Sequence, residues 1–289
     1  MIAGEAEVGP EVRVARGEAL GLAISSNRAA NLTGLEERIA EDVAARHART
    51  AAVCADVAAA EVARQAVALA RERFGGVDIV VNNAAIIRDA FIFKSDDAAW
   101  DAVLRTNLTG AQRLLAAATP AMREQAKAGR APGSIVNIVS TAGIYGNFGQ
   151  SAYAAAKAGL IGLTRVVAHD LARSGIRCNA VAPFAATRVT ESIKPANETQ
   201  AAYKQKALAV PALYVARLVS FLASDAAAHI TGQLFGARGR EVFVFSQPRP
   251  KDRVLQPRDG FDAGSMKQLE PHFAELITDL EAFSADPIL

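Results

Sequence analysis

Residues 134–160 read SIVNIVSTAGIYGNFGQSAYAAAKAGL, and this stretch decides the fold. It opens with an apolar run over residues 134–139, which has the length and branched side chains of a strand buried in a parallel sheet. A loop with several glycines follows, and an alanine-rich helical pattern then covers residues 153–173. A buried strand that leads through a loop into a helix is the repeating unit of an α/β protein.

The same unit recurs along the chain, with Gly75 and Gly175 placed where helices end. The predicted strands cover residues 50–55, 77–81, 134–139 and 176–182, and the predicted helices cover residues 34–48, 58–73, 96–128 and 153–173. After Gly232, two further strands are expected on either side of a Gly/Arg turn. The pattern predicts an α/β fold: a Rossmann-like, doubly wound parallel sheet in three layers.

The chain is expected to form one domain over residues 1–246. A proline-rich connection begins at Gln247 and leads into a C-terminal extension, residues 247–289. This extension is too short for an independent core.

Composition excludes several classes of protein. A net charge of +2 suggests neither a nucleic-acid partner nor a membrane surface. Cys54 and Cys178 each lie in an apolar run and are expected to be buried thiols, which fits a reducing cytoplasm. The first twelve residues, MIAGEAEVGPEV, lack the pattern of a signal peptide. The apolar stretch 207–223 contains Pro211 and Arg217, so it is interpreted as a core helix rather than a membrane span.

Tyr153 and Lys157 stand four residues apart, which places them on one face of a helix. An ammonium beside a phenol stabilises the phenolate, so the pKa of Tyr153 is expected to fall below its usual value of about 10. Such a tyrosine can exchange a proton with a substrate oxygen. Ser140, at the end of the predicted strand, can polarise the same oxygen. Taken alone, the Tyr–Lys pair also fits an ordinary helix with a solvated lysine.

The surrounding motifs resemble the short-chain dehydrogenase/reductase family over roughly residues 20–245. The matching pieces are Asp56–Val57, VNNAA at 81–85, Asn107 in NLTG, Ser140, Tyr153-x3-Lys157, Asn179 and Pro183. Each piece is weak alone, but their joint spacing is specific. The resemblance implies a nicotinamide-dependent carbonyl/alcohol oxidoreductase with NAD or NADP as its cofactor and with no metal ligands.

The resemblance also implies the role of each catalytic residue. Tyr153 is the acid/base, and Lys157 binds the nicotinamide ribose and lowers the pKa of the tyrosine. Ser140 orients the substrate carbonyl, and Asn107 holds a water in a proton relay.

Four further residues are assigned to the cofactor by the same resemblance. Asp56 and Val57 would contact the adenine, and Asn82 and Asn83 would lie beside the cofactor at the end of their strand. For the two asparagines, simple capping of a strand end is the alternative.

A narrower resemblance rests on IIRD at 86–89, YGNFGQSAYAAAK at 145–157 and APFAATRVT at 182–190. These segments look like the hydroxyacyl-CoA dehydrogenase part of peroxisomal multifunctional enzymes and their bacterial relatives. That group also shares the short spacing from Pro183 to Thr187, and both residues are assigned to the cofactor site. The implied reaction interconverts 3-hydroxyacyl and 3-oxoacyl thioesters, with CoA as the expected carrier. A different carbonyl substrate, such as a steroid, stays open.

A CoA thioester carries phosphates, which basic groups near the mouth of the site would attract. The candidates in the segment after Pro183 are Arg188, Lys194, Lys204 and Lys206. Ordinary surface charges on a solvated lid are the alternative for each of them.

The N-terminal region departs from the family pattern, which begins with a strand and Thr-Gly-x3-Gly-x-Gly. In one interpretation, residues 19–25 form the second strand, and the first strand and glycine loop are missing or degraded. In the other, residues 12–14 form the first strand, and Gly17, Gly21 and Ala23 mark a weakened loop. The first interpretation is favoured because the second leaves too little chain before Asp56. Either way, the first β-α unit is incomplete or atypical.

This departure leaves a rival hypothesis open. Loss of the first strand would expose backbone edges on its two neighbours, and loss of the loop would remove the main pyrophosphate contacts. The chain could then be a non-catalytic oligomerisation partner of an active paralogue. In this family the helices that carry Asn107 and Tyr153 commonly form an interface, so a homo-dimer or homo-tetramer is expected.

Arg28 follows the second strand of the favoured interpretation. An acidic residue at this place would bind the ribose 2′-hydroxyl of NAD, whereas an arginine suits the 2′-phosphate of NADP. The sequence therefore leans towards NADP(H), unless Arg28 only flanks a helix start.

Overall fold

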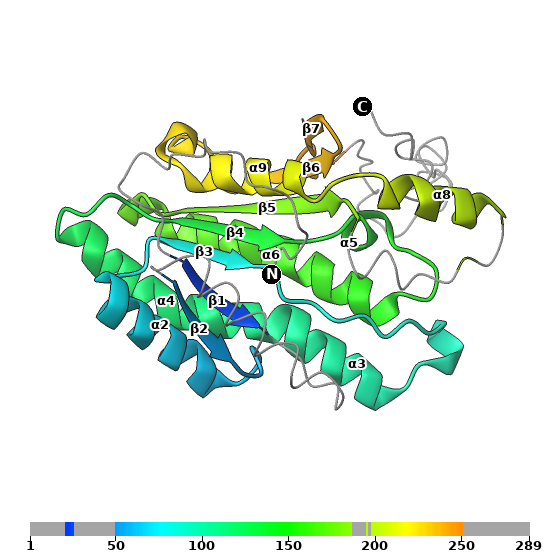
Figure 1. Cartoon of the computed structure of the whole chain (residues 1–289), viewed down its shortest axis with the longest axis horizontal. Helices are drawn as coiled ribbons and strands as arrows, with labels where there is room; N and C mark the ends of the chain where they lie inside the picture. Colours follow the sequence, from blue (N-terminus) through cyan, green and yellow to red (C-terminus); the bar gives the residue numbers. More distant parts are fainter. Residues whose placement is uncertain (1–20, 26–49, 187–194, 196–197, 251–289) are drawn as a thin grey trace, which may run out of the picture.

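The computed structural model describes residues 21–25, 50–186, 195 and 198–250 (Figure 1). Its main element is a five-stranded sheet in the order β3-β4-β5-β6-β7, and β1 and β2 form a separate two-stranded sheet. The strands are β1 (Gly21–Ser25), β2 (Thr50–Cys54), β3 (Ile79–Asn82), β4 (Ser134–Ile138), β5 (Arg177–Phe184), β6 (Leu234–Arg238) and β7 (Glu241–Val244). All four strands predicted between residues 50 and 182 are confirmed, with small shifts at their ends.

Strand direction confirms the predicted fold class. β3, β4, β5 and β6 run parallel to one another, as do β1 and β2. β7 returns antiparallel to β6, with Arg238 opposite Glu241. Gly239 lies in the turn with a φ of 54°, a conformation that glycine adopts at little cost. The predicted Gly/Arg turn is therefore the turn of a hairpin at one edge of the sheet.

Helices lie on both faces of the five-stranded sheet (Figure 1). α2, α4 and α6 cover one face, and α9 covers the other. The helical segments are α2 (Ala60–Phe74), η1 (Ile92–Lys94), α3 (Asp97–Leu104), η2 (Arg105–Thr109), α4 (Gly110–Lys127), α5 (Ala142–Tyr145), α6 (Ser151–Leu171), η3 (Ala172–Ser174), α8 (Glu198–Leu208), α9 (Leu213–Ala223) and η4 (Asp225–Ala227). Within the described ranges, no helix combines the length and the apolarity needed to cross a bilayer.

Two helix predictions need correction. The stretch 207–223 is not one helix, because α8 ends at Leu208 and α9 begins only at Leu213. Pro211 lies in the break, where its missing N–H and fixed φ oppose a continuous helix. The predicted helix 96–128 is interrupted by a π-helical turn, η2. The predicted helix 34–48 and residues 251–289 of the C-terminal extension lie outside the described residues.

The core follows the two-residue period of the strands. On β4, Ile135 points into a cluster with Leu115 and Met122 of α4. Its neighbour Val136 points to the opposite face and packs with Leu222 of α9. This alternation buries every residue of β4, so the strand that leads to Ser140 is fixed from both sides.

The two cysteines were predicted to be buried thiols. Cys178 is buried in β5 as a free thiol, as expected. The side chain of Cys54 lies outside the described part of the structure.

The break between the two sheets decides between the two interpretations of the N-terminal region. Gly21 and Ala23, which one interpretation placed in a glycine loop, lie within β1 and pair with β2. That interpretation is therefore wrong, and β1 is the strand that precedes and neighbours β2. Among the described residues, no strand pairs with β3 on the side away from β4. The sheet is thus divided where the first strand of the pattern is expected.

The open side of β3 also has an uncovered face. Ile79 and Val81 are each 40% exposed, whereas Val80 between them is buried against α4. Two apolar side chains on one face of an edge strand mark a surface that a complete first β-α unit would cover.

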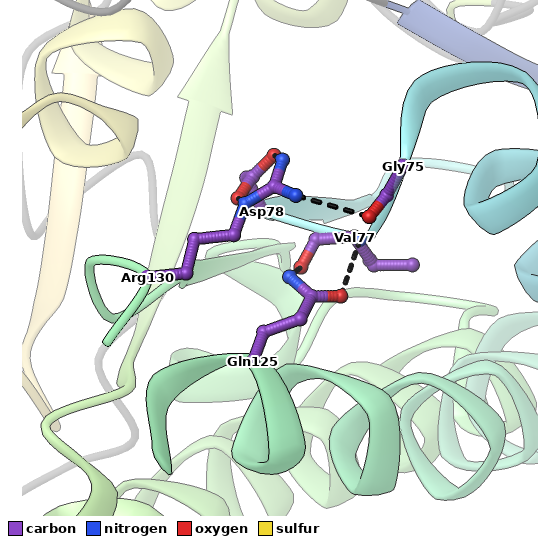
Figure 2. A network of polar contacts seen from close by, with 5 residues as sticks. All are labelled: Gly75, Val77, Asp78, Gln125 and Arg130. Carbon is purple, nitrogen blue, oxygen red and sulfur yellow. Dashed lines mark hydrogen bonds and ion pairs between the residues drawn. The ribbon is translucent and has the colours of Figure 1, made fainter. Parts of the chain in front are cut away.

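A polar network holds the entry into β3 against the end of α4 (Figure 2). The side chain of Gln125 accepts a hydrogen bond from the N–H of Val77 at 2.8 Å and donates to its carbonyl at 3.0 Å. Arg130 forms a two-pronged ion pair with Asp78 and donates to the carbonyl of Gly75 at 3.1 Å. These two side chains form hydrogen bonds with backbone groups of Gly75 and Val77, which lie before β3 and are not paired within the sheet.

Replacement of Gln125 by alanine should lower the free energy of unfolding by about 1–3 kcal/mol, because the backbone groups of buried Val77 lose both partners. Urea denaturation followed by circular dichroism measures this change. Glu124→Ala is the matched control, since its side chain is 70% exposed and makes only a 4.0 Å ion pair. Equal losses in the two variants would contradict the role given to Gln125.

Candidate active site

The site is built from the segment that directly follows β4 and from helix α6. Ser140 comes directly after the buried part of β4, and its hydroxyl accepts a hydrogen bond from the N–H of Ala142 at 3.2 Å. Tyr153 and Lys157 lie one turn apart on α6, with the Lys157 Nζ 5.6 Å from the centre of the Tyr153 ring. The side chains of Ser140 and Tyr153 are hydrogen-bonded to each other. The structure therefore brings these three predicted residues together.

Lys157 is an almost completely buried cation. It is 2% exposed, and its Nζ donates a 2.7 Å hydrogen bond to the carbonyl of Ile138 in β4. Burial lowers the pKa of Lys157 to about 8, because the charged form loses its hydration. Lys157 is thus mostly protonated at neutral pH, but its pKa lies only slightly above that pH.

The pKa of Tyr153 differs from the sequence-based expectation. Burial of the phenol raises it above its usual value, the hydrogen bond from Ser140 lowers it, and the charge of Asp89 raises it again. Burial is the largest of these causes. The predicted fall of the Tyr153 pKa below its usual value is therefore wrong, because the cost of burying a phenolate has the largest effect on it. The tyrosine is protonated at neutral pH, which is the state that a proton donor requires.

Asn107 lies in the π-helical turn between α3 and α4 and is 1% exposed. Its side chain accepts a hydrogen bond from the N–H of Ile86 at 2.8 Å and donates to the carbonyl of the same residue at 2.9 Å. Ile86 in turn packs in the cluster that contains Tyr153. The side-chain amide of Asn107 is thus hydrogen-bonded to the backbone beside Tyr153. Wide turns of this kind often occur at functional sites.

The loop after β2 is held by residues of η2, which contains Asn107, and of α4. Asp56 pairs with Arg105, and Arg113 donates to the carbonyl of Ala58. A Cβ at Gly110 would lie 3.2 Å from both the side chain and the carbonyl oxygen of Val57, so a larger residue there would require Val57 to shift. These contacts position Asp56 and Val57 at the carboxyl end of β2. Arg105 and Arg113 could not be found from the sequence, because pairing over about 50 residues leaves no local signal.

The asparagines after β3 have different surroundings. The Asn82 amide donates to the Asn137 side chain at 2.7 Å, and Asn137 donates to Thr164 at 2.9 Å. Asn82 is therefore partly engaged inside the sheet, which agrees with the strand-end alternative, whereas Asn83 is exposed. Pro183 lies within β5 and is half-buried.

Several predicted residues lie outside the described residues. These are Arg28 and Thr187 at the cofactor and Arg188 and Lys194 near the substrate. Lys204 and Lys206 are both on α8.

The described residues fit the nicotinamide end of a dinucleotide. The carboxyl ends of the parallel strands β3, β4 and β5 meet at one edge of the sheet, which is where doubly wound folds hold such ligands. At this edge the Lys157 ammonium donates one of its three N–H groups to the carbonyl of Ile138. Residues 1–20, where the expected glycine loop would precede β1, and residues 26–49 after β1 lie outside the described residues. The fit therefore applies to the nicotinamide and its ribose.

A protonated phenol beside a buried ammonium at this edge fits the proton transfer that nicotinamide-dependent oxidoreductases require. A sequence profile described as enoyl-(acyl carrier protein) reductase matches residues 24–237. The chain belongs to the short-chain dehydrogenase/reductase family and is an NAD(P)-dependent oxidoreductase, as its motifs predicted.

Individual relatives agree with this assignment. The chain is 40% identical over 230 residues to the 3-oxoacyl-[acyl-carrier-protein] reductase of Synechocystis, covering 78% of this chain and 88% of the relative. It is 37% identical over 293 residues to the hydroxyacyl-CoA dehydrogenase ChsB1 of Mycobacterium tuberculosis, covering 97% and 91%. A crystal structure of a short-chain dehydrogenase from Mycobacterium avium superposes with a TM-score of 0.68 at 30% identity, covering 82% of this chain and 77% of the other.

The burial of Lys157 predicts how stability depends on pH. Between its folded pKa of about 8 and its ordinary value of 10.5, the unfolded chain binds more protons at this group than the folded protein. Stability should therefore rise with pH in this window. Relative to Lys157→Met, the parent should gain on the order of 2 kcal/mol from about pH 7 to about pH 10, measured by urea denaturation. A difference between the two proteins that does not change with pH would contradict the shifted pKa.

Proposed function

We propose that this enzyme interconverts 3-hydroxyacyl and 3-oxoacyl thioesters, with CoA as the carrier. The observation that carries the proposal is the hydrogen-bonded pair of Ser140 and Tyr153 with the Lys157 ammonium 5.6 Å from the tyrosine ring. The names of the relatives support the acyl substrate, since they specify a 3-oxoacyl reductase and a hydroxyacyl-CoA dehydrogenase. The second of these covers nearly the whole chain, which supports CoA over a carrier protein.

The nicotinamide and the side chains of Tyr153, Ser140 and Lys157 have different roles in the proposed reduction. The nicotinamide, when bound, supplies a hydride to the carbonyl carbon. Tyr153 gives its proton to the carbonyl oxygen, and Ser140 donates a hydrogen bond to the same oxygen. Lys157 stabilises the phenolate that remains. In the oxidation, Tyr153 takes the proton from the alcohol.

The remaining predicted residues are proposed to hold the cofactor. Asp56 and Val57 would contact the adenine, and Asn82, Asn83, Pro183 and Thr187 would line the nicotinamide side. Lys157 would bind the ribose. The protein is proposed to act in the cytoplasm as a homo-dimer or homo-tetramer, with residues 1–246 as the catalytic domain and residues 247–289 as its extension.

Replacement of Tyr153 by phenylalanine should reduce kcat for acetoacetyl-CoA reduction at least about a hundredfold, because the proton donor is lost. Absorbance of the reduced nicotinamide measures this rate. Tyr145→Phe is the control, since this half-buried tyrosine lies on the short helix α5 and packs near Phe245. Activity of Tyr153→Phe within a few-fold of the parent would exclude Tyr153 as the donor.

The lean towards NADP(H) rests on Arg28. The parent should bind NADPH more tightly than NADH, and Arg28→Ala should weaken NADPH binding about tenfold or more while leaving NADH nearly unchanged. Titration followed by nicotinamide fluorescence measures both. Equal effects on the two cofactors would contradict the assignment of Arg28. No binding of either cofactor by the folded parent would favour the non-catalytic partner instead.

A further inference from the structure

A pocket of about 350 Å³ lies next to Tyr153, between the loop after β3 and the start of α6. Ser151 and Ala152, which directly precede Tyr153, line one side of it. Trp100 lines another side and also packs in the cluster that contains Tyr153. This volume is within the range of pockets that bind small molecules. The proposed mechanism leaves the pocket without a function.

The two loops that border the pocket are joined to each other. The N–H of Ala90 donates to the carbonyl of Gly149 at 2.8 Å, and the Gln150 amide donates to the Asp89 carboxylate at 3.2 Å. Ala90 and Gln150 also form a parallel bridge. The residues that follow Ala90 and precede Gly149 therefore lie on adjoining loops.

Those residues form an exposed aromatic rim, defined as Phe91, Phe93 and Phe148. They are 51%, 76% and 76% exposed, and the rings of Phe91 and Phe93 stack at 5.5 Å. Ile92 between them is 72% exposed. Ala90, which lines the pocket, directly precedes Phe91 in the chain, so the rim begins at the border of the pocket. An exposed apolar surface beside a pocket is typical of a site for an apolar group of a ligand.

The charges of the pocket indicate which part of a thioester it suits. Asp89 and Asp96 are two carboxylates in its wall, against a single cation, Arg88. The Arg88 guanidinium is engaged with the carbonyl of Ile87 at 2.9 Å. Such a wall repels the phosphates of a CoA carrier, so the neutral end of the substrate fits this side better.

We infer that the pocket and its aromatic rim bind the acyl chain of the thioester, so that the enzyme binds CoA thioesters with a long acyl chain more tightly than CoA alone. This inference rests on the proposed function and adds the class of acyl group. The carrier then leaves the site on the other side, away from Asp89 and Asp96.

Trp100 is the only tryptophan of the chain, so its fluorescence reports on the pocket directly. Decanoyl-CoA, which cannot react because it lacks the 3-oxo group, should change the emission with micromolar affinity, and free CoA should change it at least tenfold more weakly. Phe148→Ala should weaken decanoyl-CoA binding about tenfold. Phe221→Ala on α9 should leave it unchanged, although this ring is also exposed.

Three outcomes would overturn the inference: equal responses to decanoyl-CoA and free CoA, no response to either, or equal affinities of Phe148→Ala and the parent. A change of mass of the Phe148→Ala oligomer in sedimentation would also overturn it, since the rim would then be an interface with a second copy. The titration needs no turnover, so its result is separate from the proposed function. That function fails only if the parent with NADPH or NADH reduces no 3-oxoacyl-CoA.

Discussion

The buried ammonium of Lys157 is the constraint on which the site depends. Its Nζ reaches from α6 to the carbonyl of Ile138, so one hydrogen bond joins the helix that contains Tyr153 to the strand that leads to Ser140. A cation is costly to bury, and the low pKa of Lys157 expresses that cost. Burial of the neighbouring phenol raises the pKa of Tyr153. The position of α6, the protonation of Tyr153 and the charge of Lys157 therefore all depend on burial at this place.

Much of the fold could be predicted because buried parallel strands leave an apolar signal in the sequence. β4 was found almost to the residue, since all five of its residues are buried. β3 was placed less well, because two of its residues are exposed and the entry at Val77 is held by side chains rather than by strand pairing. The break in α8–α9 could have been predicted from Pro211.

The sequence predicted that Ser140, Tyr153 and Lys157 lie together, but it did not predict how burial shifts their pKa values. The spacing of Tyr153 and Lys157 placed them on one face of a helix, but spacing carries no information about burial. The predicted direction of the shift in the Tyr153 pKa was therefore wrong. Contacts between distant loops, such as Asp89 with Gln150, were also missed, because no local pattern in the sequence encodes them.

The division of the sheet has a consequence for how the molecule can vary. The five-stranded sheet and the residues Asn107, Ser140, Tyr153 and Lys157 all come from one continuous stretch of chain, residues 79–244. The two-stranded sheet contacts α2, which also packs on α4, so α2 joins the two parts. The residues proposed to transfer the proton are thus separate, in the chain and in the sheet, from the region expected to bind the dinucleotide phosphates. Nucleotide binding could therefore diverge in this protein without disturbing the geometry around the tyrosine.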